Sequence, residues 1–233
     1  MMRLKKNLLL LSMWLLLSCN QKNITIYDTN FEILHGRVRT LTEIFKNHDG
    51  IETHTTYFDK NGNAIKMLEI GGTCNKCELS FSYKYGRGER KKEVIMTGRY
   101  GQQPYACDSN GRIAEEKFDT KDYDFDKKDF AKKKEVFKYD ARGYLKESAS
   151  YDSTARTYFT THQYDSRGLL TKTNEFSGTM KKPYITVEYR YLILDKQGNW
   201  LKCATVLKYH ILVESKMQET VSRDTQTRKI TYY

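Results

Sequence analysis

Short segments of the chain alternate apolar and polar residues, and this pattern predicts β-strands. The clearest examples are residues 135–139 and 186–192, where the two kinds of side chain fall on opposite faces at a period of two. A second strand-like segment follows each of them, at residues 144–147 and 200–206. These pairs of segments predict antiparallel hairpins.

A repeated turn motif, Asp-x-x-Gly after an aromatic or apolar residue, separates such segments. An Asp at the first position of a type I turn caps the turn amides, and a Gly three residues later can take the left-handed conformation of a G1 bulge. Residues 85–88 fit as a degenerate copy. The five full copies carry the aspartates Asp59, Asp108, Asp140, Asp165 and Asp195 and the glycines Gly62, Gly111, Gly143, Gly168 and Gly198.

The expected fold is therefore all-β, an antiparallel meander of five or six consecutive β-hairpins over residues 31–233. Three arrangements fit this meander, namely a long twisted sheet, an open barrel and a sandwich. Residues 220–223 and 227–233 are expected to form its last hairpin. The composition agrees, because 18 Tyr, only 2 Pro and a mean hydropathy of −0.74 suit sheets with wide solvated faces.

The N-terminus predicts export. Residues 1–18 contain a basic start and an apolar run from Leu8 to Leu17, the proportions of a secretory signal peptide and too short for a transmembrane helix. The tetrad that ends in Ser18 and Cys19 resembles the lipobox of bacterial lipoproteins. That resemblance implies cleavage before Cys19 and attachment of acyl chains, palmitate among them, to this cysteine. Residues 19–30 then form a lipid anchor and tether.

The expected location follows from the same segment. Asn20 is not the aspartate associated with retention at the inner membrane, and no acidic cluster follows Cys19. We expect an outer-membrane lipoprotein of the cell envelope that faces the periplasm, with the membrane as partner through the acyl chains. The formal net charge of +11 comes with acids and bases interleaved along the chain, which is typical of solvated faces. We expect no nucleic-acid partner.

The turn motif also resembles a known family. Aromatic-Asp-x-x-Gly, with Gly-Asn-Trp ending in Trp200, is similar to the YD repeats of Rhs-type proteins, and in particular of short YD-repeat lipoproteins. Residues 34–43 resemble the first strand of such domains. The resemblance covers about residues 35–200 and implies an extracytoplasmic all-β scaffold that binds or encloses other molecules. It implies no catalysis, because the large chains of that family carry their enzymes in separate domains.

Four further cysteines allow several pairings. Cys74 and Cys77 form a C-x-x-C motif, for which a disulfide is the default in an oxidising compartment, within the pair or from one member to Cys107 or Cys203. A thioredoxin-like motif would sit at the start of a helix, and a zinc site would need two more ligands at suitable spacing. We expect a disulfide.

The sequence offers no recognisable active site. Neither H-E-x-x-H nor G-x-S-x-G occurs, and His48 and His54 are interpreted as turn and strand-surface residues. We expect no catalytic residue, no metal, no cofactor and no enzyme activity.

The functional prediction is a non-catalytic, lipid-anchored envelope scaffold or protein-interaction module. The alternative is a lipoprotein that binds glycan or peptidoglycan, with an unknown envelope protein or glycan as partner. A scaffold predicts an exposed edge strand or apolar patch and no concave pocket, whereas a glycan-binding protein predicts tyrosines on a concave face. The candidate ligand contacts are Tyr83, Tyr85, Tyr100, Tyr105, Tyr158 and Tyr184.

Overall fold

The computed structural model describes residues 24–27, 32–47, 50–71, 74–87, 90–99, 101–117, 133–152, 155–213 and 216–233. The predicted signal peptide (residues 1–18), Cys19 and Tyr100 lie outside these residues. Two short strands come first, β1 (Ile24–Tyr27) and β2 (Glu32–His35), which pair with each other. Within the described residues, no helix has the length and apolarity needed to cross a membrane.

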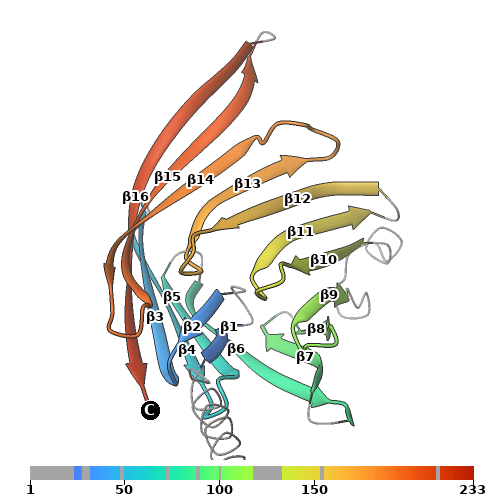
Figure 1. Ribbon diagram of the computed structural model, residues 1–233, viewed down its shortest axis with the longest axis vertical. Helices are drawn as coiled ribbons and strands as arrows, with labels where there is room; N and C mark the ends of the chain where they lie inside the picture. Colours follow the sequence, from blue (N-terminus) through green and yellow to red (C-terminus); the bar gives the residue numbers. More distant parts are fainter. Residues whose placement is uncertain are drawn as a thin grey trace, which may run out of the picture.

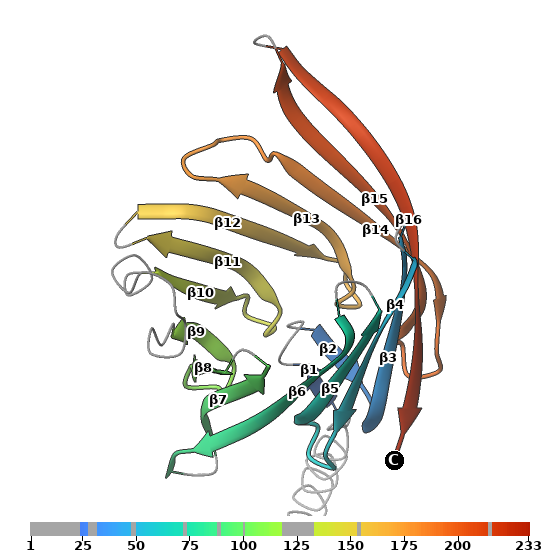
Figure 2. The ribbon, with the colours of Figure 1, turned by 180° about the vertical axis from the view of Figure 1, so that it is seen from behind.

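The next fourteen described strands form a closed barrel (Figures 1 and 2). Every strand pairs antiparallel with its neighbour in sequence, and the last strand pairs with the first, so the all-β meander is confirmed and closes on itself. The strands are β3 (Val38–Asn47), β4 (Gly50–Phe58), β5 (Ala64–Gly71), β6 (Cys74–Tyr85), β7 (Lys91–Gly98), β8 (Gly101–Cys107), β9 (Ile113–Lys117), β10 (Lys133–Tyr139), β11 (Leu145–Asp152), β12 (Ala155–Tyr164), β13 (Leu170–Ser177), β14 (Ile185–Leu194), β15 (Trp200–Val213) and β16 (Lys216–Tyr232).

The Asp-x-x-Gly segments all lie at one end of the barrel, which we call the turn rim. They follow β4, β8, β10, β12 and β14, and alternate connections of an antiparallel meander fall on the same side. We call the opposite end the far rim. At Asp140, for example, the carboxylate accepts hydrogen bonds from the amides of Arg142 (2.9 Å) and Tyr144 (3.0 Å). The amide of Gly143, at a φ of 93°, donates to the carbonyl of Asp140.

The same set of bonds recurs in the other four turns, and each is accompanied by a register shift in the flanking strands. The turn after β6 belongs to the series, although Gly86 stands where the others have Asp. Its amide donates to the carbonyl of Arg90, as the amide of Asp59 donates to that of Asn63. The same short motif thus forms the turns along the turn rim of the barrel.

Three expected boundaries differ from the structure. Residues 34–43 do not form one strand, because Gly36 takes a φ of 87° and separates β2 from β3. Residues 220–233 do not form a hairpin, because β16 runs unbroken and pairs with β15 along its first part and with β3 along its last. Strand β1 lies within the residues expected to be a tether.

The core lies inside the barrel near the turn rim. Leu34 of β2 is fully buried there against barrel residues such as Phe58, Val94 and Phe137, so the short β1–β2 sheet helps to fill this end of the lumen. Asn199, in the turn after β14, bonds both the amide (2.7 Å) and the carbonyl (2.7 Å) of His35. These bonds fix the end of β2 to the turn rim.

A buried ion pair joins the strands that close the barrel. The Nη2 and Nε atoms of Arg228 on β16 donate to Oε1 of Glu43 on β3 at 2.7 and 3.1 Å, and the two side chains are only 4% and 6% exposed. The guanidinium also lies 3.6 Å from the ring centroid of Trp200. This seam connects residues that are 185 positions apart.

Candidate binding site in the barrel lumen

The barrel encloses a cavity of about 600 Å³. Its wall is mostly apolar and includes Met67, Phe81, Met96, Phe137 and Leu145. Successive residues of a strand alternate between the lumen and the outer face, so the wall is built from every second residue. Cavities of this size commonly hold small organic ligands.

Three carboxyl groups interrupt this apolar wall. Two of them, Glu116 of β9 and Glu135 of β10, are directly opposite each other in the strand register. Burial, the negative charge of Glu135 and a hydrogen bond with its carboxyl together raise the pKa of Glu116 to about 7. Burial likewise raises the pKa of Glu135, although its hydrogen bond with Glu116 acts in the opposite direction. Near neutral pH the pair therefore titrates as a unit that shares a proton.

The third carboxyl, Glu175 of β13, is opposite Thr160 of the neighbouring strand β12 in the strand register, and a buried histidine lies beside it on β12. His162 of β12 is opposite Thr173, and its Nδ1 atom lies 3.3 Å from the Thr173 hydroxyl. Burial lowers the pKa of His162 to about 4, so the ring is neutral at pH 7. The cavity thus combines an apolar wall with carboxyl groups and contains no charged imidazole at His162.

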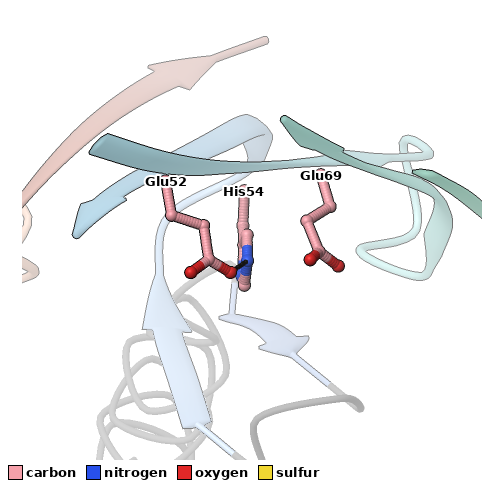
Figure 3. Close-up of side chains that lie close together, drawn as sticks. All are labelled: Glu52, His54 and Glu69. Carbon is pink, nitrogen blue, oxygen red and sulfur yellow. Dashed lines mark hydrogen bonds and ion pairs between the residues drawn. The ribbon is translucent and has the colours of Figure 1, made fainter. Parts of the chain in front are cut away.

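A second polar group lies closer to the far rim. Glu52 and His54 of β4 and Glu69 of β5 project from the same face of the sheet (Figure 3). Their ligand atoms all lie within 4.8 Å of one another, and His54 Nε2 is 2.6 Å from Glu52 Oε1. The expectation that His54 is a strand-surface residue is wrong, since His54 lines the cavity. Its polar neighbours in sequence gave no sign of which face of β4 points inward.

The outer face of the barrel carries the opposite kind of surface. Ion pairs connect neighbouring strands there, such as Lys84 with Glu93 at 2.7 Å and Lys138 with Glu147 at 2.8 Å. Two more pairs are Lys66–Glu78 at 2.7 Å and Lys208–Glu188 at 3.0 Å. Lys138 lies between the lumen-facing residues Phe137 and Tyr139, which assigns it to the outside. The outer face thus carries ion pairs beside exposed apolar side chains such as Ile51, which is 62% exposed, while the lumen is largely apolar and acidic.

The five candidate tyrosines within the described residues do not gather into one ligand-binding face. Tyr105 lines the cavity, but Tyr85 is 52% exposed beside the turn after β6. The hydroxyl of Tyr83 donates to the carbonyl of Ala64 at 2.6 Å. The rings of Tyr158 and Tyr184 meet edge to face, and the Tyr184 hydroxyl lies 3.4 Å from Glu175 Oε2. Within the described residues, most of these hydroxyls thus interact with the protein itself.

The cysteine predictions are resolved in part. Cys77 is disulfide-bonded, whereas Cys107 and Cys203 form no disulfide. The proposed bonds to Cys107 or Cys203 are therefore wrong. The reason is the topology: Cys107 ends β8 and Cys203 lies fully buried in β15, whereas Cys77 lies in β6. Sequence spacing alone could not show that these strands are separated around the barrel.

Comparisons with known proteins bear on the fold. No protein-family model matches the chain, and no curated protein does. Among solved structures, the fold is similar to the crystal structure of a porin-like protein from Bacteroides uniformis, with a TM-score of 0.50 and 13% sequence identity. The match covers 83% of this chain and 98% of that one. At this identity the likeness concerns the barrel fold alone.

Proposed function

We propose that this protein is a non-catalytic, lipid-anchored protein of the outer membrane that binds a small amphipathic cation in its barrel lumen. The observation that carries the proposal is the cavity of about 600 Å³, whose apolar wall holds the carboxyl groups of Glu116, Glu135 and Glu175. A scaffold would need no such cavity. The proposal thus favours the binding role over the purely structural one.

The chemistry of the wall selects the class of ligand. Residues such as Phe81, Met96 and Phe137 favour an apolar body, because its transfer from water is favourable. The Glu116–Glu135 pair favours a positive charge, since a cation beside it replaces the shared proton and removes the repulsion between two carboxylates. An anionic ligand would have to overcome that repulsion. An alkylamine or another amine with a hydrophobic body meets both conditions.

The outer face supports a barrel immersed in water. Barrels that span an outer membrane present an apolar band about 25 Å tall to the lipid, and a Lys at the bilayer midplane costs about 2–4 kcal/mol. Here Lys208 and Glu188 form an ion pair on the outside of the sheet, midway along β14. Threonine pairs such as Thr42 with Thr55 add further polar surface. A lipid anchor would hold such a barrel at the membrane without inserting it.

The position of β1 suggests how the barrel is oriented. Ile24 pairs with His35, which is fixed to the turn rim by Asn199. Ile24 lies five positions after Cys19, and an extended chain of five residue steps spans at most about 18 Å. An acylated Cys19 would therefore keep the turn rim next to the membrane and leave the far rim directed into the periplasm.

The test is fluorescence binding of dansylcadaverine, an amine with an aromatic body, to the mature protein purified in mild detergent. We expect saturable binding at one site, and much weaker binding of dansylglycine, which has the same fluorophore and a negative charge. Replacing both carboxyls of the Glu116–Glu135 pair, in Glu116→Gln with Glu135→Gln, should weaken binding of the amine by about tenfold. The matched control, Lys138→Gln with Glu147→Gln, changes a charged pair on the outer face and should have no effect.

Equal binding of the anionic probe would refute the proposed ligand class. Absence of saturable binding by either probe would refute the lumen site. Labelling of cells with a membrane-impermeant reagent, before and after the outer membrane is opened, tests the proposed periplasmic location separately.

A protein-interaction role remains the second candidate, because one strand edge is accessible. β16 pairs with β3 only along residues 227–232, so its residues 218–225 are exposed beyond the end of that pairing. An exposed edge can receive an extended segment of another protein. Replacement of Val221 by Pro should abolish such binding without changing dansylcadaverine binding.

A further inference from the structure

The Glu52, His54 and Glu69 side chains form a compact set of potential metal ligands outside the carboxyl pair that carries the proposed function. Glu52 and His54 are two positions apart on β4 and so share a face, and His54 is directly opposite Glu69 of β5 in the strand register. Figure 3 shows the three side chains projecting together from these strands. The backbone thus brings one imidazole and two carboxylates to a single point.

The surroundings hold this set in place. The side chains of His54 and Glu52 are each 24% exposed, and the His54 ring packs against Phe45 with its centroid 5.1 Å away. Both strands lie inside a continuous sheet and are paired on both sides. Ligands on paired strands lose little conformational freedom when they bind an ion, which favours affinity.

We propose that Glu52, His54 and Glu69 bind a divalent transition-metal ion such as Zn²⁺ or Mn²⁺. One nitrogen and carboxylate oxygens suit these ions, whereas Ca²⁺ and Mg²⁺ take oxygen ligands almost exclusively. Zinc ligands lie about 2.0–2.2 Å from the ion, so atoms within 4.8 Å of one another need only small side-chain rotations to converge on it.

The site would keep at least one coordination position directed toward the cavity. Three protein ligands leave a tetrahedral ion with an open fourth position, and His54 itself lines the cavity. The ion would also neutralise the two carboxylates. Without an ion, a hydrogen bond joins His54 Nε2 and Glu52 Oε1 at 2.6 Å, which is the competing explanation of their proximity.

Competition titrations with a chromophoric chelator test the proposal. The mature protein, carrying no polyhistidine tag, is titrated with Zn²⁺ and with Mn²⁺, and Ca²⁺ serves as the comparison ion. We expect one Zn²⁺ per chain and weak or no binding of Ca²⁺. The replacements His54→Gln and Glu69→Gln should each weaken Zn²⁺ binding by at least about tenfold.

Glu116→Gln is the matched control, because it removes another lumen carboxyl and should leave Zn²⁺ affinity within about twofold. Circular dichroism of each variant verifies that the barrel is folded, and Glu69→Gln preserves the shape of the side chain should His54→Gln unfold it. Zn²⁺ binding that is absent from the unaltered protein, or unchanged in both variants, would overturn the proposal. Dansylcadaverine binding without added metal reports on the proposed function independently.

Discussion

Removing one member of the buried ion pair at the barrel seam should destabilise the protein strongly. In Arg228→Met the carboxylate of Glu43, which is 6% exposed, loses the two hydrogen bonds at 2.7 and 3.1 Å that compensate its burial. Leaving one charge of a buried pair without its partner costs about 3–5 kcal/mol. The loss of the guanidinium over Trp200 adds about 1–2 kcal/mol.

The double variant separates the contribution of the ion pair to stability from the cost of leaving one of its charges buried alone. Glu43→Gln with Arg228→Met leaves no buried charge at the seam, so we expect it to be more stable than Arg228→Met alone. The matched control is Lys138→Met, which breaks a cross-strand pair of similar length whose side chains are 56% and 22% exposed. Exposed pairs of this kind contribute about 1 kcal/mol or less.

Urea unfolding measures these differences at pH 7. Trp200 is the only tryptophan of the sequence after residue 18 and lies at the seam, so its fluorescence reports on this region, and circular dichroism reports on the whole barrel. Coincident transitions from both probes would support two-state analysis. If Arg228→Met lowers the free energy of unfolding no more than Lys138→Met does, the buried ion pair does not stabilise the seam as we describe.

Three further predictions concern individual groups. The pKa of Glu116 is raised to about 7 in the folded state, so folding is favoured while this group is protonated, and this contribution to stability is lost as pH rises from about 5 to 8. The loss is about 1–2 kcal/mol after allowance for solvent exposure. Chemical denaturation at both pH values should find a smaller loss in Glu116→Gln. The pKa of His162 is lowered to about 4, so its burial destabilises the protein as pH falls below about 6.5, by about 2–3 kcal/mol at pH 4. His162→Gln should therefore lose less stability than the unaltered protein over that pH range. An identical decline in the two proteins would contradict this prediction. Asp140→Ala removes the acceptor for the amides of Arg142 and Tyr144 and should cost about 1 kcal/mol in thermal unfolding, whereas Arg142→Ala, which leaves those bonds intact, should cost less.

The turns could be predicted from the sequence because their cause is local. Asp140 and Gly143 make their hydrogen bonds within five residues of chain, so their spacing suffices to identify the turn. The same holds for the meander, since each strand pairs with its neighbour in sequence. Barrel closure is different, because the pairing of Thr227 with Ile44 joins the two ends of the meander. No local pattern distinguishes that pairing from the free edges of an open sheet or a sandwich.

The lumen groups could not be predicted for a related reason. At the start of β4 the apolar Ile51 is exposed and faces outward, whereas the polar residues His54 and Thr56 face inward. The usual assignment of apolar residues to the inside therefore gives the wrong face for this part of the strand. Glu116 and Glu135 meet only because β9 and β10 pair, and the mixed acidic and basic residues between them in the sequence do not indicate a strand register. Pairs of carboxyls across a sheet become visible once the strand partners are known.

The distribution of side chains, more than the barrel itself, argues for the proposed function. A barrel fold is compatible with a membrane pore, a scaffold or a ligand carrier, because the backbone is the same in each. What differs is which face is apolar. Here Lys208 and Glu188 pair on the outside, while Phe81 and Phe137 line the inside together with the Glu116 carboxyl. A pore would require the reverse arrangement on both faces. A barrel with ion pairs on its outer face, and with a lumen that suits an apolar body with a positive charge, fits the proposed binding of such a ligand.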